Sequence, residues 1–445
     1  MREALSGPLD ADVAIVGAGY TGLWTAYYLK RAQPSLRVVI LEAQRSGFGA
    51  SGRNGGWVTG FFSGPPRAYA RDGGREGFAA LQRAMFATVD EIARVLGDRS
   101  EIGQQIDADF VKGGHLAVAL DGAQAARLRA HTLQMRGLGV GDQDLRELQG
   151  DELDQRVRIA GAQLAIFSPH AARVQPAKLV AGLAAAVERL GVTIYEQTPV
   201  REILPGQART AVGDVRARWV VRATEGYTPS LRGMRRALVP MNSSMIVTVP
   251  LAASAWEEIG WRGAEVIDDG AHVFVYLQRT ADGRIAIGGR GVPYRFGSRT
   301  DGDGSTARAT VDSLRGKLQG MFPALAGVEI DHAWSGVLGV ARDWCVSIGA
   351  DVDSGQAWAG GYVGQGVAAA NLAGRTLSDL LLERRSELTQ LPWVARRPPR
   401  WEPEPLRWAA IRGVYSLYRQ ADRIERRSGR PSLLARLVDA ASGRR

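Results

Sequence analysis

The alternation of apolar and polar positions near the start of the chain predicts a strand, a helix and a second strand. Val13–Val16 is a short apolar run, which is typical of a parallel strand buried on both faces. Thr21–Arg31 has the composition of a helix that ends before Pro34, and Arg37–Leu41 is a second apolar run. This order favours the βαβ unit of an α/β domain.

Three later segments repeat this arrangement. Pro176–Leu190 is an amphipathic helix with proline at its start, and Val192–Glu196 is expected to be a strand. Ala217–Ala223 is another apolar strand, and Gln356–Leu382 combines a strand, a glycine turn and a helix. We expect these distant segments to belong to the same α/β domain as the first strands.

The pattern changes between Pro240 and Gly291, where short apolar runs alternate with turns. Strands are expected at Ser244–Val249, His272–Gln278 and Ile285–Gly288, with turns at residues 268–270 and 281–283. Such spacing is typical of an antiparallel sheet. Further helices are expected at residues 78–96, 124–136, 149–155 and 306–321, and a further strand at residues 113–120.

The sequence therefore predicts an α/β fold with two interleaved domains. The first, nucleotide-binding domain is discontinuous, and the second is an α+β substrate domain inserted into it. We assign residues 9–84, 166–236 and 331–390 to the first domain, residues 85–165 and 237–330 to the second, and residues 391–445 to a basic helical extension.

A glycine-rich turn follows the first strand. It reads GAGYTG, so that Gly17 allows a tight turn, Gly19 admits a pyrophosphate and Gly22 lets the next helix pack closely. Glu42 ends the second strand, where an acid binds the ribose hydroxyls of an adenine dinucleotide and disfavours NADP. A tight turn without a ligand would explain Gly17 and Gly22 but leave Gly19 and Glu42 without a role.

Two more glycine-rich stretches indicate a ligand larger than a nicotinamide dinucleotide. Ser46–Gly60 contains GFGASGRNGGWVTG, and the turn before the last helix of the domain contains Gly361, Gly364 and Gly366. Both would bring backbone amides close to a second part of the ligand. An NAD-dependent dehydrogenase requires neither stretch and is the weaker alternative.

Composition and charge narrow the class of protein. With 445 residues, 45% hydrophobic and 23% charged, the chain is an ordinary globular protein. Its one cysteine, Cys345, excludes an internal disulfide framework and a cysteine-rich metal site. The histidines lack metal-ligand spacing, so no metal is expected.

The first residues carry Glu3 and no apolar signal region, and no stretch of about 18 apolar residues exists. We therefore expect a cytoplasmic protein without a transmembrane segment.

The net charge of +10 is concentrated in the last part of the chain. From Leu391 onward there are thirteen arginines and five acidic residues, which leaves the remainder at only +2. This distribution argues against nucleic-acid binding. The tail contains an amphipathic helix at Leu406–Arg427, and its expected apolar face comprises Leu406, Ala410, Val414, Leu417, Ala421 and Ile424. We expect this face to pack on the protein itself. The alternatives are a second subunit, giving a homo-oligomer, or an anionic membrane.

As a set, these motifs resemble those of a known family. GAGYTG with Glu42, then GASGRNGG and GGYVGQGV, together with YLQRTADGRIAIGGRG and WSGVLGVARDWCVSIG, resemble the FAD-dependent amine and amino-acid oxidoreductases of the D-amino-acid oxidase (DAO) type. The sequences of these motifs are most similar to those of the γ-glutamylputrescine oxidase-like branch. The resemblance covers about Asp12–Leu382 and implies a Rossmann-type, glutathione-reductase-like FAD domain.

The resemblance also implies which residues hold FAD. At the pyrophosphate and AMP portion these are Gly17, Ala18, Gly19, Thr21, Gly22, Glu42, Ala43, Val200, Thr224 and Gly226. Along the isoalloxazine they are Ala50, Ser51, Arg53, Asn54, Gly55, Gly56, Gly361, Gly364, Gln365, Gly366 and Val367. Cys345 has apolar neighbours and is interpreted as a buried hydrophobe, so the FAD is expected to be non-covalent.

Departures from the family bear on the substrate. Gln365 stands where many relatives have histidine, and Trp57–Phe62 and Val367–Ala369 are apolar where relatives that oxidise amino acids carry arginine or lysine. The resemblance therefore implies an amine with an apolar or aromatic body. Ile285–Gly289 lacks the lysine that promotes oxygen reactivity in some relatives, so oxygen and another acceptor both remain open.

The residues expected to act on the substrate are Gln365, Tyr276, Arg290, Trp57 and Trp334. His272 has the same parity as Tyr276 on the expected strand and would share its face. The expected reaction is oxidation of an amine C–N bond by hydride transfer to flavin N5, with hydrolysis of the imine and O2 as the acceptor. The alternatives are an amino-acid dehydrogenase or oxidase, and a flavin electron-transfer subunit that uses another acceptor.

Overall fold

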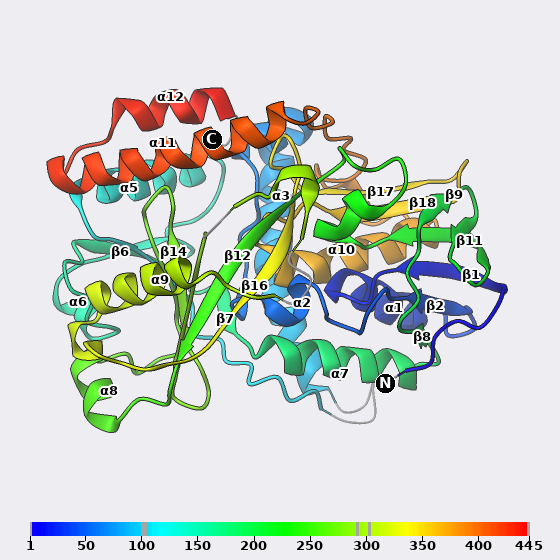
Figure 1. Cartoon of the computed structure of the whole chain (residues 1–445), viewed down its shortest axis with the longest axis horizontal. Helices are drawn as coiled ribbons and strands as arrows, with labels where there is room; N and C mark the ends of the chain where they lie inside the picture. Colours follow the sequence, from blue (N-terminus) through cyan, green and yellow to red (C-terminus); the bar gives the residue numbers. More distant parts are fainter. Residues whose placement is uncertain (1, 99–104, 291–292, 301–303, 443–445) are drawn as a thin grey trace.

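The first of two large sheets forms the right half of the molecule in Figure 1. The computed structural model describes residues 2–98, 105–290, 293–300 and 304–442. The order of this sheet is β17 (Ser347–Asp351), β18 (Gln356–Gly360), β11 (Asp214–Arg222), β1 (Leu9–Val16), β2 (Val38–Leu41) and β8 (Thr193–Tyr195). The strands from β18 to β8 are parallel, and β17 is antiparallel. β9 (Glu202–Leu204) and β10 (Gln207–Arg209) extend β11 as a hairpin.

Helices cover this sheet because its apolar runs have two faces to bury. They are α1 (Tyr20–Ala32), α3 (Pro66–Gly97), α7 (Pro176–Arg189) and α10 (Gly366–Leu381). α1 and α10 approach closely at Gly374, where a Cβ would lie 2.7 Å from Cβ of Trp24. α3 buries Phe78, Leu81 and Met85 in the same core cluster. The predicted strands and helices of the α/β domain are thus present, and α3 begins earlier than the sequence pattern indicated.

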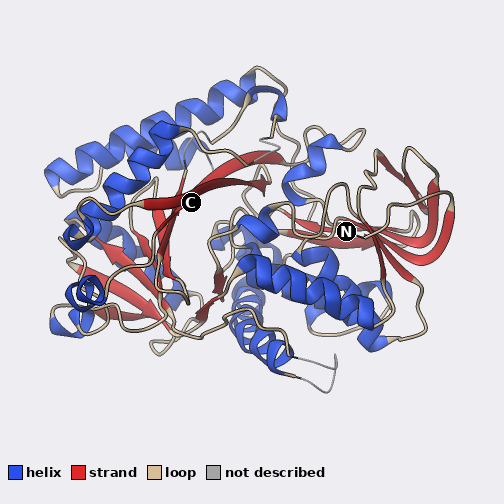
Figure 2. Ribbon diagram, turned by 60° about the horizontal axis from the view of Figure 1, so that its bottom comes forward, coloured by secondary structure: helices blue, strands red, loops and turns tan. Residues whose placement is uncertain are grey.

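The second large sheet is separate from the first, as Figure 2 shows. Its order is β16 (Ile330–Val340), β12 (Val239–Thr248), β15 (Ile285–Gly289), β14 (Val275–Arg279), β13 (Val266–Asp269), β4 (His115–Ala119), β6 (Leu164–Ser168) and β5 (Arg146–Leu148). It is antiparallel except where β13 runs parallel to β4. Around it lie α5 (Gly122–Gly137), α6 (Asp151–Asp154), α8 (Ala253–Ile259) and α9 (Arg308–Met321). Leu314 and Leu318 of α9 pack into its core cluster.

Two short elements lie in the sequence between β2 of the first sheet and β4 of the second. They are α2 (Ala50–Arg53) and β3 (Trp57–Thr59), and β3 pairs with β7 (Ala171–Arg173). The expected domain boundaries differ from sheet membership at two strands. β6 and β16 belong to the second sheet, although residues 166–168 and 331–340 were assigned to the first domain. Backbone pairing of β6 with β4 and of β16 with β12 places both strands in this sheet.

Two local predictions in the second sheet are wrong. The expected turn at Asp268 and Asp269 is part of β13, because both residues pair with β4. The strand expected from His272 begins only at Val275, so His272 does not share a strand face with Tyr276. The backbone N–H groups of His272 and Val273 instead donate to Asp422 at 2.8 and 3.0 Å. Bonds to a side chain thus replace the ladder bonds that a longer strand would make.

The C-terminal extension forms α11 (Leu406–Ser428) and α12 (Leu433–Ser442), which lie along the upper edge of the molecule in Figure 1. The predicted packing face of α11 is wrong at Leu406, Ala410, Leu417 and Ile424, which are exposed, whereas Ala421 is buried as expected. Leu406, Leu417 and Ile424 are 63%, 39% and 43% exposed. The buried side chains of α11 are Arg407, Ile411, Tyr415, Tyr418, Ala421 and Glu425. Within the described residues, no helix is long and apolar enough to span a membrane.

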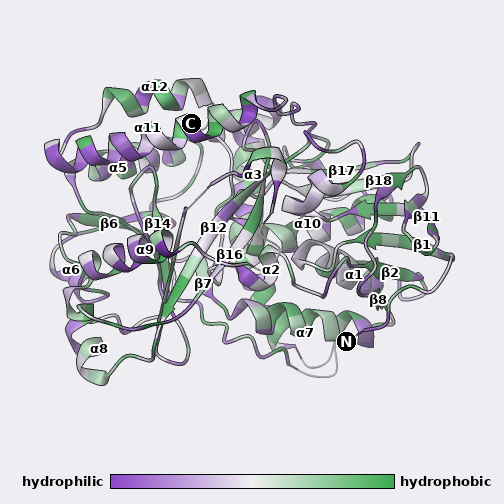
Figure 3. Ribbon diagram, in the orientation of Figure 1, coloured by the Kyte–Doolittle hydropathy of each residue, from purple (hydrophilic) through white to green (hydrophobic). Residues whose placement is uncertain are grey.

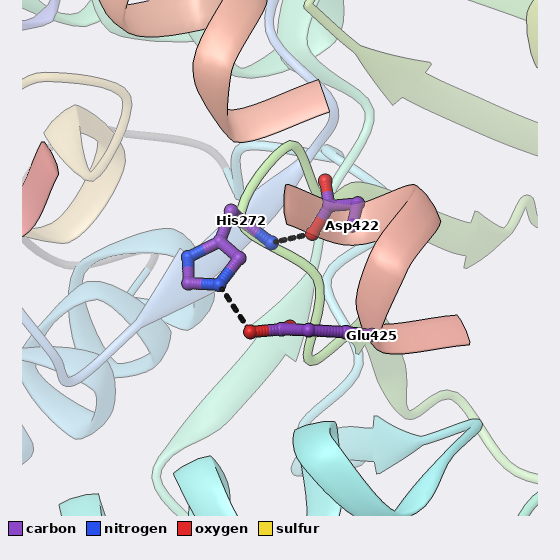
Figure 4. A group of neighbouring side chains, drawn as sticks. All are labelled: His272, Asp422 and Glu425. Atoms are coloured by element: carbon purple, nitrogen blue, oxygen red, sulfur yellow. Dashed lines mark hydrogen bonds and ion pairs between the residues drawn. The ribbon is translucent and has the colours of Figure 1, made fainter. Parts of the chain in front are cut away.

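An ionic clamp of Arg127, His272, Asp422 and Glu425 joins α11 to α5 and to the loop before β14, and Figure 4 shows the last three of these residues. Glu425 accepts hydrogen bonds from Arg127 and from the Ser432 backbone N–H at 2.9 Å, and its Oε1 lies 3.2 Å from Nε2 of His272. The His272 ring stacks on Tyr418 with centroids 5.2 Å apart. His272, Asp422 and Glu425 place their ligand atoms within 4.8 Å of one another. Hydrogen bonds to Arg127 and the backbone already account for this grouping.

We expect Glu425→Gln to destabilise the protein by about 2 to 4 kcal/mol, because it leaves the partly buried Arg127 without its carboxylate. Burial alone would raise the pKa of Glu425, but bonding from His272 and Ser432 and the charge of Arg127 lower it to about 2. A lowered pKa stabilises the fold above the ordinary value of 4.5, and this advantage is lost as the pH falls toward 2.

Urea unfolding of both proteins at several pH values measures this difference. Glu76→Gln is the matched control, because Glu76 is exposed and the structure records no bond to its side chain. Equal stability of Glu425→Gln and the unchanged protein at neutral pH would contradict the clamp.

Candidate active site

A large cavity lies at the carboxyl ends of the parallel strands, and its volume is about 590 Å³. Val16, Leu41 and Ala223, which end or follow β1, β2 and β11, form its floor. A cleft in this position and of this size is typical of nucleotide sites in α/β sheets. The expected residues that line it are Gly17, Gly19, Thr21, Glu42, Ala43, Ala50, Ser51, Asn54, Val200, Thr224, Gly226, Gly364, Gly366 and Val367.

The first glycine turn has no room for side chains. Gly17 has a φ of +110°, and a Cβ there would lie 2.7 Å from the carbonyl oxygen of Ala223. A Cβ on Gly22 would lie 2.0 Å from the carbonyl oxygen of Gly17, and one on Gly19 would lie 2.9 Å from Oγ of Ser51. The start of α1 therefore lies directly against the strand ends, and Gly17, Gly19 and Thr21 line the cleft beside it. This is the geometry that a pyrophosphate at a helix N-terminus requires.

Glu42 lies beside this turn. Its carboxylate accepts the Ala18 N–H at 2.8 Å and the Gln44 N–H at 2.9 Å. Burial raises the pKa of Glu42, and these backbone bonds partly oppose the rise. The carboxylate is thus fixed in direction at the cleft wall, with acceptor capacity left for ribose hydroxyls.

Glu225 organises the third glycine turn, and the sequence analysis missed its role. It accepts N–H groups from Gly361 at 2.9 Å and from Tyr362 and Gly339 at 3.2 Å. Burial raises the pKa of Glu225 to about 7, although these bonds and the charge of Arg222 favour the carboxylate. Its φ of +40° turns the chain after β11 into the cleft. The signal was an acid between two expected cofactor residues, Thr224 and Gly226.

A second, smaller cavity adjoins the first and contains most of the expected substrate residues. It is lined by Trp57, Tyr276, Arg290, Gln365, Arg53 and Gly55, together with the unpredicted Ser243, Asp268, Phe274, Leu338 and Val363. The two cavities share Ala50, Asn54, Leu338, Gly364 and Val367. A ligand in the larger cleft can therefore present one end to the smaller cavity.

Tyr276 is fixed between the sheet and the second glycine stretch. It pairs across the sheet with Gly288, where a Cβ would lie 2.3 Å from the Tyr276 ring. A Cβ on Gly55 would lie 2.6 Å from the same ring. The Tyr276 hydroxyl lies 2.8 Å from Oγ of Ser243, and the Trp57 ring meets Tyr276 edge-on at 5.9 Å. Because Gly55 and Gly288 have no side chains, the rings of Tyr276 and Trp57 can form an aromatic wall of the cavity.

Charged groups of both signs flank this wall. Asp268 is the cross-strand partner of Tyr276 on β13, and its Oδ1 lies 3.1 Å from Nε2 of His115. Arg290 follows β15 on the other side of β14. Its Nη1 is buried and has no hydrogen-bond partner among the described residues. An unpaired buried guanidinium nitrogen indicates a site for an acceptor group.

Five expected site residues line neither cavity: Ala18, Gly22, Gly56, Gly361 and Trp334. Ala18 and Gly361 instead donate backbone N–H groups to Glu42 and Glu225. The structure places Trp334 behind the site, where its ring stacks on His332 and its Nε1 donates to the Arg53 carbonyl at 2.9 Å. These residues shape the cavity walls from outside.

Cys345 is fully buried in the core cluster of the α/β domain and lines neither cavity. Burial, followed by the nearby charge of Asp343, raises the pKa of its thiol to about 12. A thiol with these properties is inert, so the structure gives no support for covalent attachment of a cofactor.

The sequence profile of the FAD dependent oxidoreductase family (DAO) matches residues 12–380 of the chain. The chain belongs to this family. The resemblance inferred from the motifs is therefore confirmed, the cofactor is FAD, and the protein is an FAD-dependent oxidoreductase. The glycine turns and Glu42 fit that cofactor, since Gly17, Gly19 and Gly364 line the cleft together with Glu42, and the close packing around Gly17 leaves no space for a side chain there.

Known DAO-family proteins are similar over most of their length. The chain is 31% identical over 404 residues to the γ-glutamylputrescine oxidoreductase of Escherichia coli strain K12, covering 88% of each chain. Glycine oxidase from Geobacillus kaustophilus superposes with a TM-score of 0.73 at 21% identity, covering 88% of this chain and 100% of the other. L-proline dehydrogenase from P. horikoshii superposes with a TM-score of 0.69 at 19% identity, covering 87% and 98%. The predicted fold class is confirmed.

We expect Glu42→Gln to weaken FAD binding by about tenfold to a hundredfold, because an amide replaces a charged acceptor and turns a donor toward the Ala18 or Gln44 N–H. Titration of FAD into the apoprotein, followed by quenching of flavin fluorescence, gives the dissociation constant. Asp10→Asn is the control on an exposed carboxylate of the same sheet. An unchanged dissociation constant for Glu42→Gln would remove Glu42 from the cofactor site.

Proposed function

We propose that the protein oxidises a C–N bond of an amine that carries a second polar group at its far end. Acting on amines or amino acids is the chemistry named for its relatives, among them γ-glutamylputrescine oxidoreductase and glycine oxidase. The observation that carries the proposal is the smaller cavity, where an aromatic wall lies between Asp268 and the unpaired Arg290. These groups suit a substrate with an ammonium and a carboxylate or carbonyl.

FAD, when bound, would supply the redox chemistry as the acceptor of a hydride from the substrate. Trp57 and Tyr276 orient the substrate chain, because their rings are fixed by packing and by the Ser243 and Leu277 contacts. Asp268 binds the cationic group, and Arg290 binds the anionic or carbonyl group. Gln365, which precedes α10, lines the same cavity beside the Gly364 turn. The imine product is then hydrolysed by water.

The first test is anaerobic addition of amines to the purified holoenzyme while the flavin absorbance is recorded. We expect bleaching by an amine that bears a distal carboxylate or amide, and little bleaching by simple alkylamines or glycine. Recovery of the absorbance on admission of air would identify oxygen as the acceptor. Bleaching by small amino acids alone would favour the amino-acid oxidase alternative. Absence of bleaching by any amine or amino acid would favour the electron-transfer subunit.

We expect Asp268→Asn to lower kcat/KM for an amine with a distal carboxylate or amide by about tenfold to a hundredfold, because the asparagine side chain lacks the charge that binds an ammonium. Steady-state or anaerobic reduction kinetics measure the effect. Asp312→Asn is the matched control, since Asp312 is exposed on α9 with no recorded bond. An effect of equal size on an uncharged amine would show that Asp268 supports the fold rather than the ammonium.

A further inference from the structure

The C-terminal helices expose an unusual share of the large apolar side chains. Ten large hydrophobic residues are classed as exposed among the described residues, and five of them lie between residues 406 and 437. They are Leu406, Leu417, Ile424, Leu433 and Leu437, with exposed fractions of 63%, 39%, 43%, 72% and 70%. We call this set the exposed apolar residues of the extension.

Their spacing places them in lines along each helix. On α11 the steps between Leu406, Leu417 and Ile424 correspond to whole helical turns, so the three side chains share one stripe. On α12, Leu433 and Leu437 are one turn apart. The opposite sides of α12 are buried through Ala435 and Val438. α11 and α12 pack on each other and on the rest of the protein, and these contacts leave the exposed apolar residues of both helices uncovered.

The acidic and the basic residues of the extension differ in the contacts that they make. The acids are engaged in local contacts: Glu402 with Arg342, Glu404 with Arg407, Asp422 and Glu425 in the clamp, and Asp439 with the Tyr418 hydroxyl. The exposed arginines of the two helices and their connection are Arg412, Arg419, Arg423, Arg426, Arg427, Arg430 and Arg436. No ion pair is recorded for these seven within the described part of the chain. The outer surface therefore combines leucine with unpaired positive charge.

Aromatic side chains mark one end of this surface. Phe296 is 48% exposed and meets Trp408 edge-on at 6.2 Å, and the guanidinium of Arg412 lies 5.3 Å from the Trp408 ring. In Figure 3 the ribbons of α11 and α12 alternate between purple and green along the outer edge. Leucine, phenylalanine, tryptophan and arginine on amphipathic helices are the composition of interfacial membrane-binding helices.

We propose that α11 and α12 bind peripherally to an anionic phospholipid bilayer, with the exposed apolar residues inserted between headgroups and the arginines on lipid phosphates. Charge complementarity favours this occupant over a second copy of the chain, since two copies facing each other would oppose their arginines. It also favours lipid over nucleic acid, which offers no apolar layer for the leucines. The membrane interaction is independent of the proposed substrate.

The test uses the full-length holoenzyme and sedimentation with vesicles of phosphatidylcholine, with or without phosphatidylglycerol. We expect binding to vesicles that contain phosphatidylglycerol, about tenfold or more weaker binding to phosphatidylcholine alone, and release when NaCl rises from about 0.05 to 0.5 M. Equal binding to both kinds of vesicle, or binding to neither, would overturn the proposal.

The double variant Leu417→Glu/Leu437→Glu tests the apolar contribution. We expect it to reduce the vesicle-bound fraction by about tenfold or more, while its flavin spectrum and amine turnover stay as in the unchanged protein. Leu133→Glu is the matched control, because Leu133 is a 66% exposed leucine on α5. Unaltered vesicle binding by the double variant would overturn the insertion of leucines. A dimer in sedimentation velocity that the double variant abolishes, without vesicle binding, would assign the surface to a second copy instead.

Discussion

The close approach of α1 to the ends of β1 and β11 is the constraint on which the rest of the structure depends. Gly17 and Gly22 lie against backbone carbonyl groups at distances that no side chain can share. This contact fixes the direction of the α1 N-terminus, beside which Gly17, Gly19 and Thr21 line the cleft. A substitution at either position would move the helix itself, because a strand end cannot yield as a flexible side chain can.

The same device joins the cofactor cleft to the substrate cavity. Gly55, in the loop before β3, and Gly288 on β15 leave between them the space that the Tyr276 ring occupies. The Tyr276 ring therefore brings the second glycine stretch and the second sheet together at the substrate cavity. Asp268 on β13 and Arg290 after β15 lie on either side of Tyr276, which is on β14. The register of these three strands therefore decides where the two charges lie in the cavity.

The cofactor site could be predicted because its requirements are local. A strand, three glycines and an acid at the next strand end are read directly from adjacent residues. The face of α11 could not be predicted in this way. Leu406 and Leu417 form one helical line and Ile411 and Tyr415 another, and both are apolar. Which of the two lines is buried depends on Arg127 and His272, which lie far away in the sequence and pair with Glu425.

Asp268 and Glu225 illustrate the same limit. Asp268 precedes Asp269 and Gly270, a composition typical of a turn, yet strand pairing on both sides holds it in β13. Glu225 has no motif of its own, since its partners, Gly339, Gly361 and Tyr362, come from another part of the chain. Sequence patterns indicate what a segment can form, and distant contacts decide among the possibilities.

The discontinuous arrangement of the cofactor cleft has a consequence for biosynthesis. Its walls come from β1 near the start of the chain, from the segment after β11 and from the turn before α10. Because the sheet pairs β1 with β11, and β11 with β18, most of the chain must leave the ribosome before the cleft can close. FAD is therefore captured by a nearly complete polypeptide. Contacts of such long sequence separation also make this domain slow to assemble, and the cofactor then stabilises it by mass action.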